Sequence, residues 1–228
     1  MDVVFSLLQN VLEEGFIYGI VAMGVYITYK ILDFPDLSVD GTFPLGCAVT
    51  AALIVGGVNP WLACIAAFAA GALAGCVTGL LHVKLRITDL LSGIIVMTGC
   101  WSLNLLILGA HMPNPLAGNA LLQFYNQPTI FTSFPVALLP ESLYRFRVLI
   151  LAAVLAVVVK LLMDWFLRTK SGMLLRAAGD NPQFVTSLAK DQGSMKIMGL
   201  AIGNGCTALA GSILAQQAES ASVSIGTG

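Results

Sequence analysis

Six polar residues lie in or beside long apolar stretches of this sequence. They are Asp36, Ser38, Thr98, Ser102, Asn104 and Asn204. Carboxylate, hydroxyl and amide groups bind a polar solute through hydrogen bonds, and such groups are costly in hydrocarbon unless a neighbour or a watery cavity satisfies them. Two interpretations are therefore open. Either these side chains line a solute pathway, or they form hydrogen bonds between helices.

Covalent chemistry has no support in the sequence. The chain has only two histidines, His82 and His111, and contains neither an H-E-x-x-H nor a G-x-S-x-G motif. The five cysteines fall in apolar stretches without a C-x-x-C pair, which indicates small buried side chains rather than disulfides or metal ligands. Lys160 and Asp164 have the spacing of a local helical ion pair, which we prefer to a proton relay. We predict no catalytic residue, no metal site and no cofactor bound by this chain.

The composition indicates that the surroundings of the chain are lipid. Of the 228 residues, 57% are hydrophobic and 10% are charged, and the mean hydropathy is +0.88, whereas soluble domains have about 25% charged residues. This excludes both a soluble globular protein and a disordered chain. The net charge of −1 gives no basis for nucleic-acid binding.

The apolar stretches have the length of membrane-spanning helices, each of which needs about 20 mostly apolar residues. They are continuously apolar rather than alternating, which favours helices over a β-barrel. We therefore predict an all-α, polytopic transmembrane helical bundle that forms one domain over residues 1–228. The six predicted spans are residues 11–31, 42–57, 60–83, 88–110, 146–167 and 195–217.

Basic residues give this bundle an orientation. Eight lysines and arginines follow the first, third and fifth spans, whereas only two lie on the opposite side. The positive-inside rule places the richer side in the cytoplasm. We expect the N-terminus outside, residues 168–194 as a cytoplasmic loop, and residues 111–145 as an extracytoplasmic cap loop that packs on the bundle. A short re-entrant helix is the alternative for residues 111–145.

Small residues predict where one helix approaches another. Gly71, Gly75 and Gly79 recur every four residues, so one face of the third span is nearly flat. Small residues at this spacing are the usual packing surface of membrane helices. We assign these three glycines to helix packing.

Residues 33–44 interrupt the helices with two prolines, Pro35 and Pro44. We expect the second span to begin near Thr42 with Pro44 in its first turn, which would leave free N–H groups at the positive end of the helix dipole. A broken helix beside a cavity is one way in which transporters present polar backbone to a solute. A cytoplasmic turn capped by aspartates is the alternative.

The loop at residues 168–194 predicts a docking element. Asn181-Pro182 starts a short helix, because proline is favoured at the first helical position. Phe184, Val185 and Leu188 then share one face. We expect this amphipathic helix to dock into a groove on a soluble partner.

Two motifs resemble those of a known family. Thr169, Gly172, Arg176, Ala177 and Asn181 match a T-x-x-G-x-x-x-R-A-x-x-x-N-x-x-x-A pattern, with Val185 in place of the last alanine. Residues 36–39, Asp-Leu-Ser-Val, followed by Gly46, resemble a D-L-S-V-G…G motif, with Asp40 where glycine is frequent. These patterns are similar to those of permease subunits of ATP-binding-cassette importers in the branched-chain amino acid and monosaccharide permease family.

The resemblance implies a division of labour. Two permease copies, expected as a homodimer, form the pathway in a bacterial cytoplasmic (inner) membrane, and an extracytoplasmic solute-binding protein delivers the solute. The chain lacks a G-x-x-x-x-G-K-[ST] motif, so ATP and Mg²⁺ are expected on a cytoplasmic ATPase dimer. The coupling residues would be those of the loop motif together with Pro182, Phe184 and Val185. Family members usually continue for further spans beyond the equivalent of Gly228, so we expect this sequence to be less than a whole permease.

The expected solute is a small organic molecule, first an aromatic or branched-chain amino acid, because the pathway offers apolar walls and few fixed charges. A monosaccharide or nucleoside is the alternative within the same machinery. An ion-coupled secondary transporter is the alternative from another class, although such proteins usually carry intramembrane carboxylates or bases, and few are found here far from the span ends.

Overall fold

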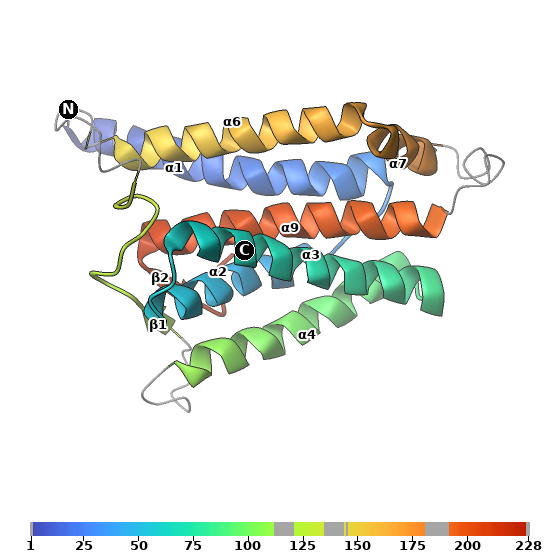
Figure 1. Cartoon of the computed structure of the whole chain (residues 1–228), viewed down its shortest axis with the longest axis horizontal. Coiled ribbons are helices and arrows are strands. Elements are labelled where there is room, and N and C mark those ends of the chain that lie inside the picture. Colours follow the sequence, from blue (N-terminus) through green and yellow to red (C-terminus); the bar gives the residue numbers. More distant parts are fainter. Residues whose placement is uncertain (1, 112–120, 135–143, 145, 181–191, 227–228) are drawn as a thin grey trace.

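The computed structural model describes residues 2–111, 121–134, 144, 146–180 and 192–226. Its helices run side by side along an elongated bundle (Figure 1). In chain order the elements are α1 (Asp2–Val25), the π-helix η1 (Tyr26–Ile31), α2 (Val39–Val55), α3 (Pro60–Leu85), α4 (Asp89–Ala110), β1 (Leu121–Gln123), α6 (Arg147–Arg168), α7 (Lys170–Asp180), α9 (Gln192–Ala218) and β2 (Ser220–Ser222). The predicted polytopic helical bundle is confirmed, with one short sheet added to it.

Five helical stretches are long and apolar enough to cross a membrane. They are Val4–Ile31, Pro60–Leu85, Asp89–Ala110, Arg147–Arg168 and Gln192–Ala218. These correspond to five of the six predicted spans, and the first begins earlier than predicted because the preceding residues continue the same helix. The remaining predicted span, 42–57, is α2. With 17 residues this helix is shorter than the five spanning stretches, and most of its residues are buried inside the bundle.

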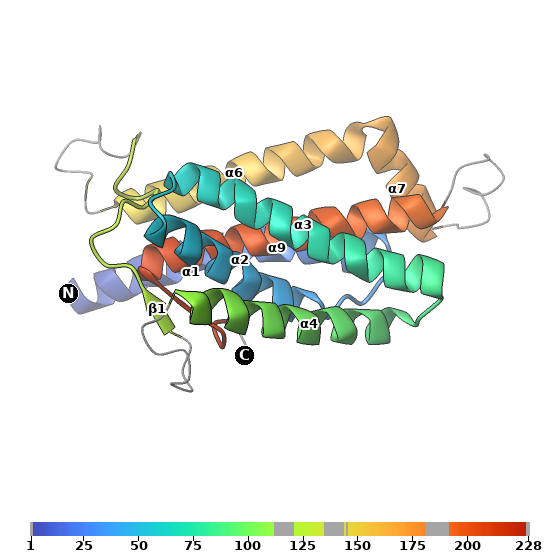
Figure 2. The ribbon, with the colours of Figure 1, turned by 60° about the horizontal axis from the view of Figure 1, so that its bottom comes forward.

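Helix α9 lies at the centre of the bundle, in contact with α1, α2 and α3 (Figures 1 and 2). The glycine face of α3 packs directly on it. A Cβ atom added at Gly75 would lie 2.7 Å from the carbonyl carbon of Leu200, and one added at Gly79 would lie 2.8 Å from the Cα of Ile197. Gly71 meets the backbone of Asn204 in the same way. Without side chains at these three positions, the two helix backbones come close together.

One end of the bundle carries a two-stranded antiparallel sheet, which the all-α prediction did not include. Leu121 pairs with Ser222 and Gln123 pairs with Ser220, so the strand after α4 is joined to the strand after α9. The residues that follow β1 pack inward through Phe124, Ile130 and Phe131, all of which are buried. Within 121–134 the structure has a strand and turns rather than a re-entrant helix. We call this the cap end.

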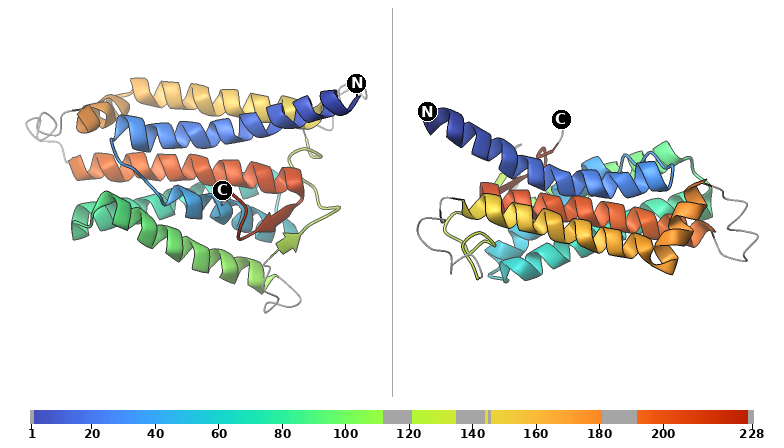
Figure 3. Two further views of the ribbon diagram at one scale, coloured as in Figure 1. Left: turned by 180° about the vertical axis from the view of Figure 1, so that it is seen from behind. Right: turned by 90° about the horizontal axis from the view of Figure 1, so that it is seen from above.

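The opposite end carries the turn between α3 and α4, the break between η1 and α2, the start of α9 and helix α7 (Figures 1 and 3). Most of the basic residues lie here, so we call it the basic end. They are Lys30, Lys84, Arg86, Arg168, Lys170, Arg176 and Lys196. The described parts of the loops that the charge pattern assigned to one side of a membrane therefore meet at one end of the bundle.

The break runs from Leu32 to Ser38. Asp33 has a φ of 52°, a left-handed conformation that Asp adopts more readily than most residues. Helix α2 then begins at Val39 rather than near Thr42. Pro44 therefore lies in the second turn of the helix instead of the first, where its missing N–H leaves one backbone carbonyl of the preceding turn without its usual donor.

Candidate functional site

A buried polar cluster joins the break to the central helix. The Nδ2 of Asn204 donates to the Asp36 carboxylate over 2.7 Å, and its Oδ1 accepts from the Thr42 hydroxyl over 2.8 Å. The Ser38 hydroxyl lies 2.6 Å from Asp36 Oδ1 and 3.0 Å from Asn204 Oδ1, and its single hydrogen serves one of them at a time. Asn204 is fully buried. Three of the six polar residues singled out from the sequence, Asp36, Ser38 and Asn204, therefore meet at one point.

The backbone around Asp36 holds the carboxylate in this place. The Ser38 N–H donates to Asp36 Oδ1 over 2.9 Å, which closes a local turn. Helix α4 approaches from the other side at Gly93, where an added Cβ would lie 2.9 Å from the Leu37 nitrogen and 3.4 Å from Asp36 Oδ1. A glycine is needed there because the break passes directly over the helix.

The other three of the six residues, all on α4, do not join this cluster. Asn104 is fully buried beside α2, with its Nδ2 3.4 Å from the Gly41 carbonyl oxygen, and its Oδ1 has no partner within the described part of the chain. Thr98 and Ser102 lie on the exposed face of α4 and bond to the backbone of their own helix. The inner and outer faces of α4 are both apolar, so the sequence alone does not distinguish them.

Helix α7 packs against the start of the break. A Cβ added at Gly179 would overlap the carbonyl oxygen of Ile31, and one added at Gly199 of α9 would press on the side chains of Leu32 and Leu175. Leu175 of α7 is fully buried. The break is therefore enclosed by α4, α7 and α9, and the contacts from α4 and α7 reach its backbone.

The predicted coupling residues fall into two groups. Thr169 caps the start of α7, with its hydroxyl 3.3 Å from the Gly172 nitrogen, and Gly172 packs on the last turn of α6. Arg176 is exposed and Ala177 is half-buried on the same helix, and Arg176 has no hydrogen bond or ion pair with the residues that the structure describes. Asn181, Pro182, Phe184 and Val185 lie outside the described residues. Helix α7 itself was not predicted, because its mixed polar composition does not distinguish it from a loop.

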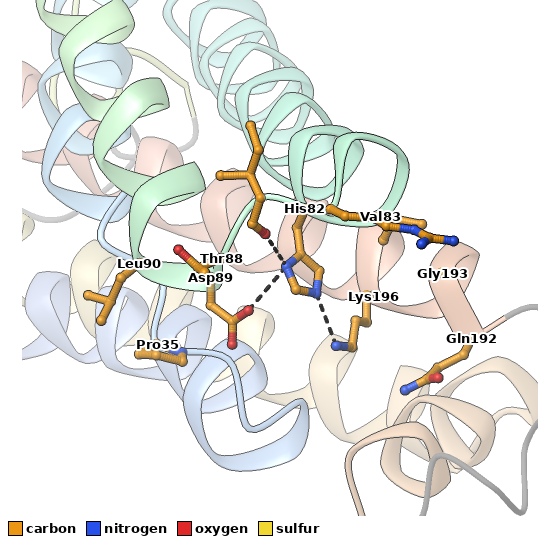
Figure 4. A pocket seen from close by; sticks show the side chains of 11 residues that line it. Pro35, His82, Val83, Thr88, Asp89, Leu90, Gln192, Gly193 and Lys196 are labelled. Carbon is orange, nitrogen blue, oxygen red and sulfur yellow. Dashed lines mark hydrogen bonds and ion pairs between the residues drawn. The ribbon is translucent and has the colours of Figure 1, made fainter.

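A further polar site lies at the basic end (Figure 4). It is a cavity of about 870 Å³. The residues that line it include Pro35, His82, Arg86, Thr88, Asp89 and Lys196. The sequence did not single it out, because its residues come from the break, the α3–α4 turn and the start of α9, which are distant in the chain.

Two other predictions can be placed. Lys160 Nζ lies 2.7 Å from Asp164 Oδ2 on the exposed side of α6, as their spacing predicts. All five cysteines are free, and four of them are buried. Among the described residues, no group of His, Cys, Asp and Glu has the arrangement of a metal site.

Apolar helices of spanning length, a glycine-packed core and a buried polar cluster at a broken helix are features of a multi-pass membrane transport protein. A family model described as the permease component of branched-chain amino acid transport systems matches residues 7–228. The chain belongs to this family.

Two curated relatives match nearly the whole chain. It is 38% identical over 219 residues to a tyrosine transport system permease protein of Clostridioides difficile, which covers 96% of this chain and 68% of the relative. It is 30% identical over 223 residues to an uncharacterized protein of Rickettsia prowazekii, covering 98% of this chain and 72% of the relative. No solved structure matches the chain. The family resemblance drawn from the two sequence motifs is thus confirmed.

Proposed function

We propose that this chain is the permease subunit of a binding-protein-dependent ATP-binding-cassette importer, and that it forms the pathway for an aromatic amino acid. The observation that carries the proposal is the 38% identity, across 96% of the chain, to a permease described as serving tyrosine transport. The family match over residues 7–228 supports the amino acid class.

In this proposal the break between η1 and α2 is the element that responds to the ATPase. Gly179 of α7 packs on Ile31 and Leu32, where the break begins, and Asp36 accepts a hydrogen bond from Asn204 of the central helix farther along. A force on α7 would therefore reach Asp36 along the backbone of the break and pass to α9 through the hydrogen bond between Asp36 and Asn204. Closure of the ATPase dimer would move α7 and rock the bundle as a rigid body.

The six proposed pathway residues lie in two places, the interior of the subunit and the outer face of α4. Asp36, Ser38 and Asn204 belong to the subunit interior, with Asn104 on the neighbouring α4. Thr98 and Ser102 face outward on α4, so we assign them to the surface where a second permease copy, in a homodimer, would complete the pathway. The apolar residues around them suit an aromatic side chain better than a sugar.

The partners follow from the two ends of the bundle. At the basic end, α7 and residues 181–185 would dock on a cytoplasmic ATPase dimer that binds ATP and Mg²⁺. At the cap end, the residues after β1 would receive a solute-binding protein. The chain would reside in the bacterial cytoplasmic membrane, with the basic end in the cytoplasm according to the positive-inside rule.

Reconstitution tests this proposal. The full permease is purified with the ATPase encoded beside it and placed in liposomes, and uptake of radiolabelled tyrosine is measured with and without the cognate binding protein. We expect uptake that requires ATP and the binding protein and is blocked by vanadate.

Three outcomes would contradict parts of the proposal. Uptake that follows an ion gradient without ATP would make the protein a secondary transporter. ATP-driven uptake of ribose or a nucleoside, but not of tyrosine, would overturn the substrate class. A permease that does not copurify with the ATPase would refute the division of labour.

A further inference from the structure

In the cavity at the basic end, an acidic and a basic side chain lie at opposite edges of the imidazole ring of His82 (Figure 4). The Nδ1 of His82 lies 3.1 Å from Asp89 Oδ1, and its Nε2 lies 3.2 Å from Lys196 Nζ. His82 comes from α3, Asp89 from the first turn of α4 and Lys196 from the first turns of α9. Three helices therefore meet around this ring.

The surroundings of His82 define its protonation. Nδ1 lies 2.9 Å from the carbonyl oxygen of Ile87, which can only accept a hydrogen bond, so Nδ1 carries the hydrogen. Nε2 faces the ammonium group of Lys196, which can only donate, so Nε2 is the acceptor. The arrangement is that of a neutral imidazole between a cation and an anion.

Within the part of the chain that the structure describes, Lys196 and Asp89 therefore lack full counter-ions. Among the described residues, Asp89 has only the neutral His82 ring within salt-bridge distance, and Lys196 has no acidic side chain within that distance. Arg86, which ends α3 in a left-handed conformation with a φ of 54°, adds a second cation at the cavity wall. A ligand that carries both a carboxylate and an ammonium group would neutralise each side, and charge-assisted hydrogen bonds of this kind are the strong ones.

The size of the cavity also suits a small ligand. Its volume of about 870 Å³ falls in the range of roughly 300–1,000 Å³ that is typical of small-molecule sites. Apolar wall area is supplied by Pro35, Val83, Ile87 and Leu90. An α-amino acid places its carboxylate and ammonium on one carbon, close enough together to reach Lys196 and Asp89 across the imidazole edge while its side chain contacts the apolar wall.

We propose that this cavity binds a free zwitterionic amino acid at the basic end of the subunit. The carboxylate would bind Lys196 and Arg86, and the ammonium group would bind Asp89. Because the ligand would tie the start of α9 to the α3–α4 turn, it would act on the same helix that carries Asn204. Only the choice of tyrosine as the first probe rests on the proposed function.

Local protection from a thiol reagent tests this site. Thr88 lines the cavity, is exposed, and makes no side-chain cap bond to α4, so a Thr88→Cys variant places a thiol in the wall. The variant is purified in nanodiscs without the ATPase, and its reaction with a charged maleimide is followed with and without L-tyrosine. The parent chain gives the background, because its own cysteines lie within the helices.

We expect the reaction of Thr88→Cys to slow about tenfold when tyrosine exceeds its Kd about tenfold. Lys84→Cys is the matched control, since Lys84 is exposed at the same end but does not line the cavity, and its reaction should not change. Asp89→Asn or Lys196→Met, each added to Thr88→Cys, should abolish the protection. N-acetyltyrosine and tyrosine methyl ester, which lack one of the two charges, should not protect.

Equal protection by the two blocked derivatives would overturn the zwitterion assignment. If neither saturating tyrosine nor a panel of other free amino acids protects the thiol, the proposed binding site is wrong. Protection by added ATPase alone would also overturn the site, because the cavity would then be a docking surface. Because the assay requires neither ATP nor uptake, a failure here is distinguishable from a failure of the proposed importer function.

Discussion

A methyl group added at Gly75 has no room between α3 and α9. The new Cβ would lie 2.7 Å from the carbonyl carbon of Leu200 and 2.9 Å from the Cα of Ala201, and it would overlap the Leu200 carbonyl oxygen. All of these atoms belong to the backbone, so no side-chain rotation relieves the contact. Since carbon atoms pack at about 3.5–4.0 Å, the Gly75→Ala substitution must move α9 by about 1 Å.

The displacement has two costs. Overpacking of a close contact destabilises by about 1–3 kcal/mol. The hydrogen bond from Asn204 to Asp36 is 2.7 Å long. Lengthening it by about 1 Å takes it beyond the usual range of about 2.7–3.2 Å. For a chain of this size, each kcal/mol lowers the melting temperature by about 2–4 °C. From the overpacking cost alone, we expect Gly75→Ala to melt at least about 2 °C and up to about 12 °C below the parent protein.

The buried cysteines supply the assay. Cys47, Cys64, Cys100 and Cys206 become reactive only when the helices separate, so a fluorogenic thiol reagent follows the melting of the purified protein in detergent. Gly99→Ala is the matched control, because an added Cβ there meets nothing within 4 Å. The control should melt at or slightly above the parent temperature, since alanine is the better helix former. Equal melting temperatures for the two variants would refute the packing of α3 on α9.

Three further predictions each concern a single residue. Asn204→Ala removes the amide donor of the Asp36 carboxylate and should cost about 1.5–3 kcal/mol, seen as a lower melting temperature; an unchanged value would show that the cluster is not formed. Arg176→Glu alters an exposed residue and should leave melting unchanged while the ATPase no longer copurifies; full copurification would exclude α7 from the docking surface. Gln216→Leu leaves the buried Ile130 N–H without its 2.9 Å acceptor and should speed hydrogen exchange in residues 121–134, whereas parent-like protection would contradict this anchor.

The helices were predictable because a spanning helix needs a long apolar run, and the runs here are separated by charges and prolines. Gly71, Gly75 and Gly79 also indicated a close helix contact. The identity of the partner, α9, was not predictable, because any helix can approach a flat glycine face. Likewise, Pro35 and Pro44 indicated a break, but α2 begins at Val39, directly after Ser38, whose N–H and hydroxyl both bond to Asp36.

The candidate site was predictable only in part. Asp36 and Asn204 stood out as polar groups in apolar surroundings, but their contact joins residues 168 positions apart, which no local pattern encodes. Thr98 stood out for the same reason, yet its hydroxyl bonds to the carbonyls of Ile94 and Ile95 on its own helix. Hydroxyl groups can satisfy themselves in this way, whereas a side-chain amide more often needs a neighbour. The sequence contains one signal of the cavity around His82, namely the charged residues that flank the short α3–α4 turn.

The most direct test of the account is tyrosine uptake by the reconstituted complex under ATP, with an Asn204→Leu permease beside the parent. We predict that the parent complex accumulates tyrosine only with ATP and the binding protein, and that the variant still binds the ATPase but transports far more slowly for each ATP hydrolysed. Tyrosine uptake that is independent of ATP, or a variant with the parent's ratio of transport to hydrolysis, would contradict it.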